Sequence, residues 1–113
     1  MNEIYTKTFE IGTSAVDLYD NIRPSSMLQL FQEMGTDHAA LLHMDRDYLV
    51  EHYHACWILA RVWYQVNRPI HAGEMLTIKT WHRGAESLIV YRDYDLLVGD
   101  EPVGEAVAAW VVA

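Results

Sequence analysis

The chain has 113 residues, of which 51% are hydrophobic and 21% charged, and its formal charge at pH 7 is −8. This length suits a single domain, and the composition is that of a compact fold rather than a disordered segment. The acidic charge repels nucleic-acid phosphates, so we expect no nucleic-acid partner. Neither a signal-peptide pattern nor an apolar run of about 20 residues is present, which predicts a cytoplasmic protein without a membrane partner.

The first part of the chain predicts a strand, a loop and a long helix. Residues 3–12 alternate loosely between apolar and polar side chains, as a strand does. Residues 13–23 carry turn-forming side chains without a period and are interpreted as a loop. From Pro24 to His43, apolar side chains recur at spacings of three and four, which predicts a helix with one buried stripe. The stripe consists of Met27, Leu30, Phe31, Met34, His38, Leu41 and Leu42.

Three details of this helix and its surroundings are also predicted. Pro24 suits the first helical turn, and Ser26 and Gln29 have the spacing of a capping box. Gly35 inside the helix costs about 1 kcal/mol relative to alanine, so we expect a strand or a ligand to approach the helix closely there. A short second helix is predicted over residues 47–53.

The rest of the chain has the pattern of strands. Strands are predicted over residues 57–66, 75–82 and 88–98 and from Val103 onward, with a tight connection at residues 83–86. Strict alternation in the first of these strands places one set of side chains on a common face: Ile58, Ala60, Val62, Tyr64 and Val66. The short turns predict that the four strands form an antiparallel meander.

One long helix ahead of such a meander predicts an α+β domain in which the sheet curls around the helix, the hotdog fold. A ferredoxin-like sheet needs two helices in a different order, and a cystatin-like sheet usually has a longer helix nearer the N-terminus. We therefore expect residues 1–113 to form a single hotdog domain. Residues 108–113 end in the middle of an apolar strand, which predicts that the chain is truncated at its C-terminus.

Short motifs spread over nearly the whole chain form an ordered set. They are Phe9-Glu10-Ile11-Gly12, Gln32-Glu33-Met34 with His38, Trp57-Ile58-Leu59-Ala60-Arg61-Val62, Asn67-Arg68-Pro69, Gly73-Glu74, Ile78-Lys79-Thr80-Trp81, Tyr91-Arg92-Asp93-Tyr94 and Ala108-Ala109-Trp110-Val111. In this order they resemble the first repeat of the acyl-ACP thioesterases. The resemblance implies two tandem hotdog repeats, acyl-ACP as substrate, water as acyl acceptor, and neither a metal nor an organic cofactor.

The resemblance also implies candidate catalytic residues. The second repeat of that family carries an Asp-x-Asn-x-His run ahead of its helix and a glutamate within the helix. Laid onto this chain, the pattern places Asp17 at the aspartate and Glu33 at the glutamate, with Tyr19 and Asn21 in place of the asparagine and the histidine. Glu33 and Asn21 are thus the catalytic candidates here, although a solvated helix face is the alternative for Glu33. The missing histidine predicts that this chain alone is not an efficient thioesterase.

The helical stripe gives the candidate substrate-binding residues Met27, Leu30, Phe31, Met34 and His38. An alkyl chain could lie between this stripe and the sheet, and methionines repack readily around variable ligands. The alternative is that the stripe is simply the core. The expected partner is acyl-ACP or acyl-CoA, and we expect a homodimer or larger homo-oligomer, because a lone hotdog exposes apolar surface and a sheet edge. The rival function is a stand-alone hotdog protein that binds acyl groups or hydrolyses acyl-CoA with Glu33.

Other kinds of site have weaker support. His52 and His54 share one strand face, but neither a cysteine pair nor a carboxylate completes a metal-binding spacing, so no metal is expected. Cys56 lies in an apolar run and is interpreted as an inert core thiol. The absence of a Gly-x-Ser-x-Gly elbow and of a phosphate-binding loop excludes a serine hydrolase and a nucleotide enzyme. The cations nearest to a patch for an acidic carrier protein are Arg61, Arg68, Lys79 and Arg83.

Overall fold

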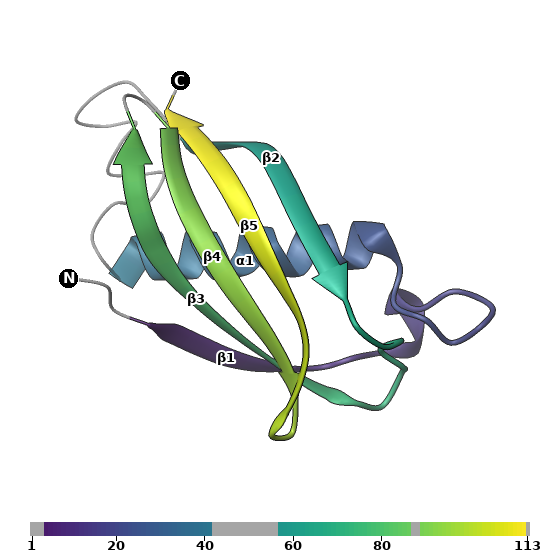
Figure 1. Cartoon of the computed structure of the whole chain (residues 1–113). Helices are drawn as coiled ribbons and strands as arrows, with labels where there is room; N and C mark the ends of the chain where they lie inside the picture. Colours follow the sequence, from purple (N-terminus) through teal and green to yellow (C-terminus); the bar gives the residue numbers. More distant parts are fainter. Residues whose placement is uncertain (1–3, 42–56, 87–88, 113) are drawn as a thin grey trace.

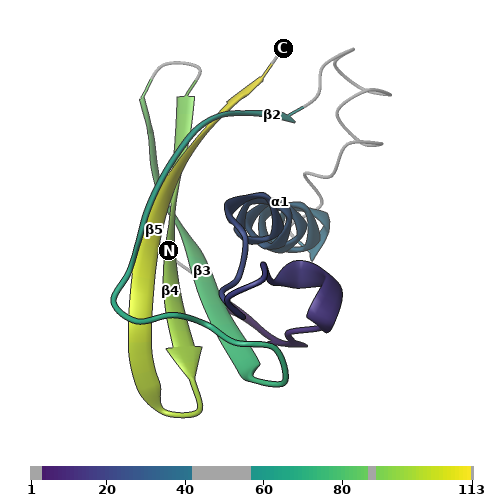
Figure 2. The same cartoon turned by 90° about the vertical axis from the view of Figure 1, so that its right-hand side faces the viewer.

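The computed structural model describes residues 4–41, 57–86 and 89–112. One long helix lies against the concave face of a five-stranded antiparallel sheet (Figures 1 and 2). The elements are β1 (Tyr5–Glu10), the short 3₁₀ helix η1 (Thr13–Ala15), α1 (Pro24–Leu41), β2 (Trp57–Val66), β3 (Met75–Glu86), β4 (Ile89–Val98) and β5 (Glu101–Val112). The predicted α+β arrangement is therefore confirmed. Among the described residues, no helix is both long and apolar enough to span a bilayer.

The order of the strands differs from the predicted meander. The order across the sheet is β1-β3-β4-β5-β2, so only β3, β4 and β5 follow one another as a meander. β1 pairs with β3 from Tyr5 opposite Thr80 to Glu10 opposite Met75, which gives β3 a neighbour on both sides. β2 consequently pairs with the free edge of β5, and residues 67–74 carry the chain back across to β3.

A bulge in β2 makes the predicted face assignment of this strand wrong in its first half. Leu59 pairs with Trp110 and Arg61 with Ala109, so Ala60 is an extra residue without a partner on β5. Since side chains alternate with a period of two, one extra residue exchanges the two faces. Ile58 is therefore 46% exposed, whereas Leu59 packs against the core.

β3 is longer than predicted, and the tight connection expected at residues 83–86 is wrong. The strand continues to Glu86, and its pairing with β4 resumes beyond an irregularity between His82 and Gly84. Because the bulge absorbs one residue, the β3–β4 ladder extends through Ala85 opposite Val90.

The core lies between α1 and the inner face of the sheet. Phe31 is fully buried, and its ring lies 4.8 Å from that of Tyr94 and 5.7 Å from that of Tyr64. The Tyr94 hydroxyl donates a hydrogen bond of 3.0 Å to the carbonyl oxygen of Phe31. The buried stripe ends at His38, because Leu41 is 64% exposed, and Leu42 lies outside the described residues.

Two of the local predictions for α1 are confirmed and one is wrong. The helix begins at Pro24, and a Cβ built on Gly35 would lie only 2.8 Å from Cζ2 of Trp110, so β5 does approach the helix closely. Ser26 is buried inside the first turn, and Met27 N–H donates to the carbonyl of Arg23, so the capping box is not formed at Ser26. The predicted second helix at residues 47–53 lies outside the described residues.

Candidate substrate-binding site

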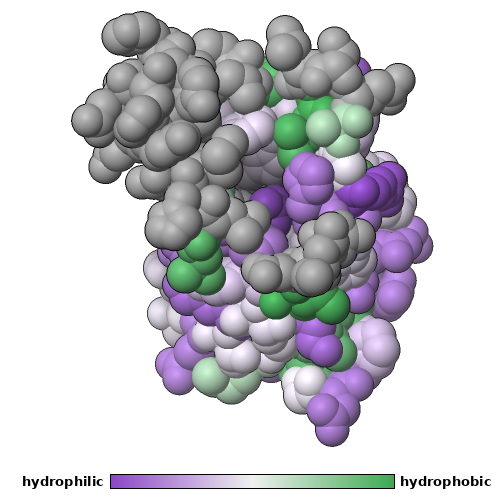
Figure 3. All heavy atoms as spheres, turned by 90° about the vertical axis from the view of Figure 1, so that its left-hand side faces the viewer, coloured by the Kyte–Doolittle hydropathy of each residue, from purple (hydrophilic) through white to green (hydrophobic). Residues whose placement is uncertain are grey.

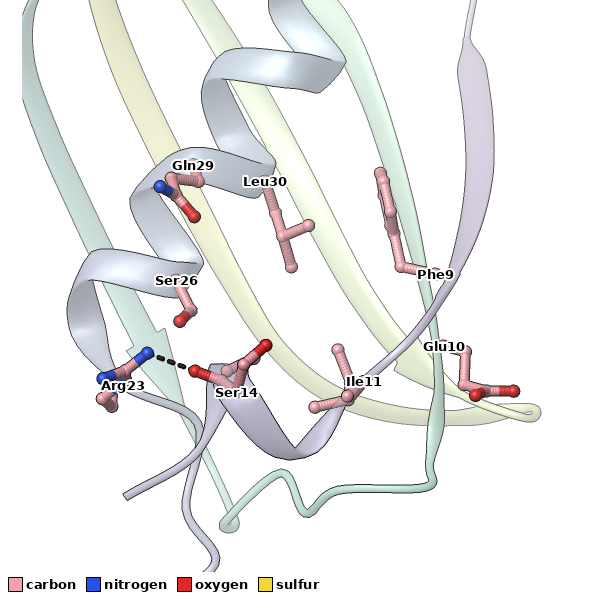
Figure 4. Close-up of a pocket in the computed structure, with 10 residues that line it drawn as sticks. Phe9, Glu10, Ile11, Ser14, Arg23, Ser26, Gln29 and Leu30 are labelled. Carbon is pink, nitrogen blue, oxygen red and sulfur yellow. Dashed lines mark hydrogen bonds between the residues drawn. The ribbon is translucent and has the colours of Figure 1, made fainter.

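A pocket of about 310 Å³ lies where the end of β1, the 3₁₀ helix η1 and the first turns of α1 meet (Figure 4). Its floor is apolar: Leu30 and Ile11 point toward each other across it, with Phe9 beside them. Polar side chains surround this floor, namely Glu10, Ser14, Arg23, Ser26 and Gln29. The pocket thus combines an apolar base with a polar rim, which is a general feature of small-molecule sites.

The rim of the pocket is electropositive on the side of the helix. The first turn of a helix carries amide groups that have no acceptor within the helix, and its dipole adds partial positive charge there. The guanidinium of Arg23 lies on the same side and donates to the carbonyl oxygen of Ser14 (Figure 4), while Arg23 N–H donates to the Ala15 carbonyl at 2.9 Å. These bonds fix a cation beside the N-terminus of α1, where developing negative charge on an oxygen would be stabilised.

Glu33 lies one helical turn beyond the pocket. Helical spacing of three and four places it on the same face as Leu30 and Gln29, which line the pocket. Its carboxylate accepts a bond of 3.0 Å from Lys7 Nζ, and this amine also lies 5.2 Å from the centre of the Phe9 ring. The side chain of Glu33 is 49% exposed, so it is a partly solvated ion pair adjacent to the pocket floor.

Asp37 shares the cation that Glu33 uses. Lys7 Nζ lies 3.2 Å from the Asp37 carboxylate, and the hydroxyl of Tyr5 donates to the same carboxylate at 3.4 Å. The hydrogen bonds to Glu33 and then to Asp37 raise the pKa of Lys7. Burial, followed by the negative charge of Asp37, raises the pKa of Tyr5. β1 is thereby fastened to α1 by charges on the outer side of the helix.

Asn21 lies at the base of a short hairpin ahead of α1. The Asp17 carboxylate accepts hydrogen bonds from the backbone N–H groups of Tyr19 and Asn21 at 2.8 and 3.1 Å, and Asp17 N–H donates to the Asn21 carbonyl. Asp17 therefore shapes the turn, as aspartates often do. Asn21 precedes the helix, whereas Glu33 lies nine residues after Pro24, about 14 Å along the axis. The structure gives the two catalytic candidates different neighbours.

Most of the predicted substrate-binding side chains are enclosed in the core. Met27, Phe31 and Met34 are at most 1% exposed and His38 is 3% exposed, whereas Leu30 is half-buried and opens onto the pocket. Leu30 is therefore the member of the predicted set that the structure places at the pocket.

His38 belongs to a polar cluster in the interior. Arg92 Nη1 lies 2.7 Å from His38 Nδ1 and 3.4 Å from Thr80 Oγ1, and the ring of Tyr5 stacks on His38 at 5.6 Å. Arginine has no acceptor, so His38 Nδ1 accepts this bond and is unprotonated. Burial lowers the pKa of Arg92, and burial together with the charge of Arg92 lowers the pKa of His82.

Residues 2–113 match the family model described as the acyl-ACP thioesterase N-terminal domain. The chain belongs to this family. The family consists of thioesterases, and thioesterases are hydrolases. No curated protein matches the chain.

Solved thioesterase structures share the fold of this acyl-ACP thioesterase domain. An acyl-ACP thioesterase from Bacteroides thetaiotaomicron has a TM-score of 0.90 and 19% identity, over 96% of this chain and 45% of that chain. A 1,4-dihydroxy-2-naphthoyl-CoA thioesterase from Synechocystis has a TM-score of 0.85 and 14% identity, over 97% and 82%. A DHNA-CoA thioesterase from Staphylococcus aureus has a TM-score of 0.86 and 14% identity, over 96% and 73%. The predicted hotdog fold is confirmed, and the chain spans less than half the length of the Bacteroides enzyme.

Sequence reasoning missed three residues of this acyl-ACP thioesterase domain. Arg23 lines the pocket but lies in the segment 13–23, which has no regular period, and Ile11 lies at the end of the loosely alternating segment 3–12, whose pattern did not place it at a site. Arg92 could have been found, because strand alternation places it on the same face as the buried Tyr94 and Leu96. A charged residue in an otherwise apolar inward row is the signal that indicates an interior polar site.

Proposed function

We propose that this domain binds the acyl group of a fatty acyl thioester and is the acyl-recognising N-terminal repeat of an acyl-ACP thioesterase that acts in fatty acid biosynthesis. The observation that carries the proposal is the pocket at the N-terminus of α1, which combines an apolar floor with an electropositive rim. In this proposal the acyl chain lies against Leu30, Phe9 and Ile11. The thioester oxygen faces Arg23 and the first amide groups of the helix.

We further propose roles for Glu33 and Asn21 in hydrolysis. Thioester hydrolysis needs a base for water and donors for the oxyanion. Glu33 is held beside the pocket by Lys7 and would take the proton from water. Asn21 lies ahead of α1 and away from Glu33, so its role would be to hold the hairpin from which Arg23 reaches the substrate oxygen. Because no histidine stands at the position of Asn21, the isolated domain would be a slow catalyst.

A second candidate function has its own support. The Synechocystis and Staphylococcus CoA thioesterases are covered over 82% and 73% of their lengths, so this domain alone has nearly the size of a complete enzyme of that kind. The alternative proposal is a stand-alone homo-oligomer that hydrolyses acyl-CoA. Self-association would use β2, whose outer edge pairs with no described strand and whose Ile58 and Trp63 are 46% and 51% exposed.

The described part of the surface opposite β2 is mixed in polarity. On the face in Figure 3, which looks at the side of the molecule away from β2, the coloured atoms mix hydrophilic residues with small separate hydrophobic areas. Such a mixture is typical of exposed surface, whereas interfaces between identical chains are more apolar at their centres.

The carrier of the acyl group is also a proposal. Of the four cations considered for an acidic carrier protein, Arg68 pairs with Glu74 at 2.9 Å, and Arg83 pairs with Asp93 through its Nε at 2.8 Å. Their charges are engaged within the domain. Only Arg61 and Lys79 would therefore face an acyl carrier protein, so such a carrier would need further contacts.

Blocking the pocket tests acyl binding. We expect Leu30→Trp to fill the apolar floor and weaken binding of acyl-ACP or acyl-CoA at least about tenfold, equivalent to about 1.4 kcal/mol. Isothermal titration with one acyl chain on both carriers measures this effect and ranks the carriers. Leu28→Trp on the same helix, which is exposed and does not line the pocket, should bind like the wild type. Equal affinity of the Leu30 and Leu28 variants would overturn the assignment of the pocket.

A further inference from the structure

Arg92 is a buried cation that contacts no carboxylate among the described residues. It is 6% exposed, and its side chain meets His38 and Thr80, neither of which carries negative charge. Burying a charge is costly unless an opposite charge compensates for it. In contrast, Arg68 and Arg83 on the surface both pair with carboxylates. The buried arginine thus has less compensation, within the part of the chain that the structure describes, than these two exposed ones.

A second buried donor lies beside Arg92. Trp110 Nε1 makes no hydrogen bond of normal geometry among the described residues, although the hydroxyl of Tyr94 lies near it. Arg92 pairs with Ala108 in the ladder between β4 and β5, so Trp110, two residues further along β5, is its diagonal neighbour on the inner face. The indole ring packs on Gly35, one helical turn before His38. Both donors therefore lie under the same stretch of α1.

The other described polar side chains near this stretch supply no negative charge. The hydroxyl of Thr80 donates to the carbonyl of Asp93 at 2.8 Å and faces Arg92 Nη1 at 3.4 Å, and the hydroxyl of Tyr94 donates to the carbonyl of Phe31. His38 Nδ1 accepts from Arg92 and is neutral. Burial raises the pKa of Tyr94 to about 12, so this side chain is also neutral at pH 7. Among the described side chains of the cluster, only Arg92 is charged.

We propose that this interior cluster, Arg92 and Trp110 with His38 and Thr80 around them, binds the carboxylate of an acyl ligand. Arg92 pairs with the charge, and the Trp110 N–H donates to one of the oxygens. The ring of Tyr5, which is half-buried, covers His38, so the cluster lies one aromatic layer below the surface. This inference rests on the proposed acyl-binding function and narrows its ligands. The carboxylate comes either from a free fatty acid, the product of hydrolysis, or from the far end of a dicarboxylic acyl group.

Ligands with the same number of carbon atoms in the acyl chain distinguish these two sources of the carboxylate. The whole chain is titrated with dodecanoate, dodecanol, dodecanoyl-CoA and the CoA monothioester of dodecanedioic acid, and calorimetric heat is followed. We expect dodecanoate to bind about tenfold or more tighter than dodecanol, as charge-assisted hydrogen bonds require. A preference for the dodecanedioic thioester over dodecanoyl-CoA supports the far-end source. Equal binding of these two thioesters, with the acid still preferred over the alcohol, supports the product.

Two variants test whether the preference for dodecanoate over dodecanol depends on the cluster. Arg92→Gln removes the charge while keeping a donor for His38, and Trp110→Phe keeps the ring on Gly35 but removes the N–H. We expect Arg92→Gln to abolish the preference for dodecanoate over dodecanol and Trp110→Phe to reduce it severalfold. If Arg92→Gln does not fold, Trp110→Phe alone tests the site. Arg83→Gln on the outer face of the sheet and Trp63→Phe on β2 should keep the wild-type preference.

The possible failures are distinguishable. Equal binding of dodecanoate and dodecanol by the wild type overturns the carboxylate site and leaves acyl binding intact. A preference for the acid that survives both cluster variants also overturns it. If none of the four ligands binds, the proposed acyl-binding function fails together with this inference.

Discussion

At the scale of single residues, the ion pair of Glu33 is the feature that separates a catalytic role from a structural one. Glu33 and Asp37 contact the same amine of Lys7, at 3.0 and 3.2 Å, and lie one helical turn apart. Only Glu33 is on the turn next to the pocket. A structural role predicts similar consequences for the loss of either carboxylate, whereas a catalytic role predicts a large difference.

If Glu33 is the base, Glu33→Gln should lower the rate of thioester hydrolysis on the order of a hundredfold or more, because general bases contribute at that level. Asp37→Asn, which removes the other partner of Lys7, should change the rate little. The measurement is release of free thiol from acyl-CoA by the purified chain. Similar small losses in both variants would assign Glu33 to the helix surface and not to the chemistry.

Glu74 gives a prediction about pH dependence. Its bidentate contact with Arg68, at 2.9 and 3.0 Å, and a bond from His71 N–H lower the pKa of the Glu74 carboxyl from 4.5 to about 2. The unfolded chain therefore takes up this proton at a higher pH than the folded chain does. The stabilisation of the folded chain by the ionised Glu74 carboxylate is fully present above about pH 4.5 and is lost as the pH falls toward 2.

We expect Glu74→Gln to lower the free energy of unfolding at pH 6 and to flatten its decline between pH 4.5 and 2. Urea denaturation at a series of pH values measures both effects. Glu105→Gln, an exposed carboxylate on β5, is the control and should follow the wild-type profile. A Glu74 variant with the wild-type slope would show that the contact with Arg68 is not coupled to folding.

At the scale of elements, α1 and β5 are in close contact at Gly35. Gly35→Ala adds a methyl group 2.8 Å from the Trp110 ring, so the ring or the helix must move. The helix propensity of alanine gains about 1 kcal/mol, and overpacking costs about 1–3 kcal/mol. We expect net destabilisation by chemical denaturation, with Thr36→Ala, an exposed neighbour, as the control for propensity. A stabilised Gly35→Ala variant would contradict the close packing.

The sequence predicted which elements exist better than how they pair. The helix was found from its first residue, Pro24, onward, because side chains such as Met27, Phe31 and Met34 repeat with its period. The partner of β2 depends on which strand edges remain free, and this is decided by β1, far away in the sequence. For the site, Leu30 was found through the same period, but Arg23 was not, because its place is set by non-periodic contacts such as the bond from its N–H to the Ala15 carbonyl.

At the scale of the whole molecule, the two edges of the sheet are unequal. β1 is fastened to α1 by Lys7, whereas β2 presents Ile58 and Trp63 on its exposed side. Sedimentation of the purified chain should therefore give a species larger than the monomer, as proposed above. Trp63→Lys should shift it toward the monomer with little change in unfolding free energy, because the side chain is half-exposed. A monomeric wild type at high concentration would rule out this interface.

The extra residue in β2 affects how this chain can be compared with others. Because Ala60 is an extra residue, the side-chain alternation is interrupted there. Trp57 and Leu59 therefore lie on the same side of the sheet as Val62, although they precede it by five and three positions. An alignment with a relative whose strand lacks the bulge must place a one-residue gap at Ala60. Without that gap, inward positions N-terminal to the bulge would be matched to outward ones. A hydrophobicity profile averaged over such an alignment would then no longer show the alternation of inward and outward side chains at the start of β2.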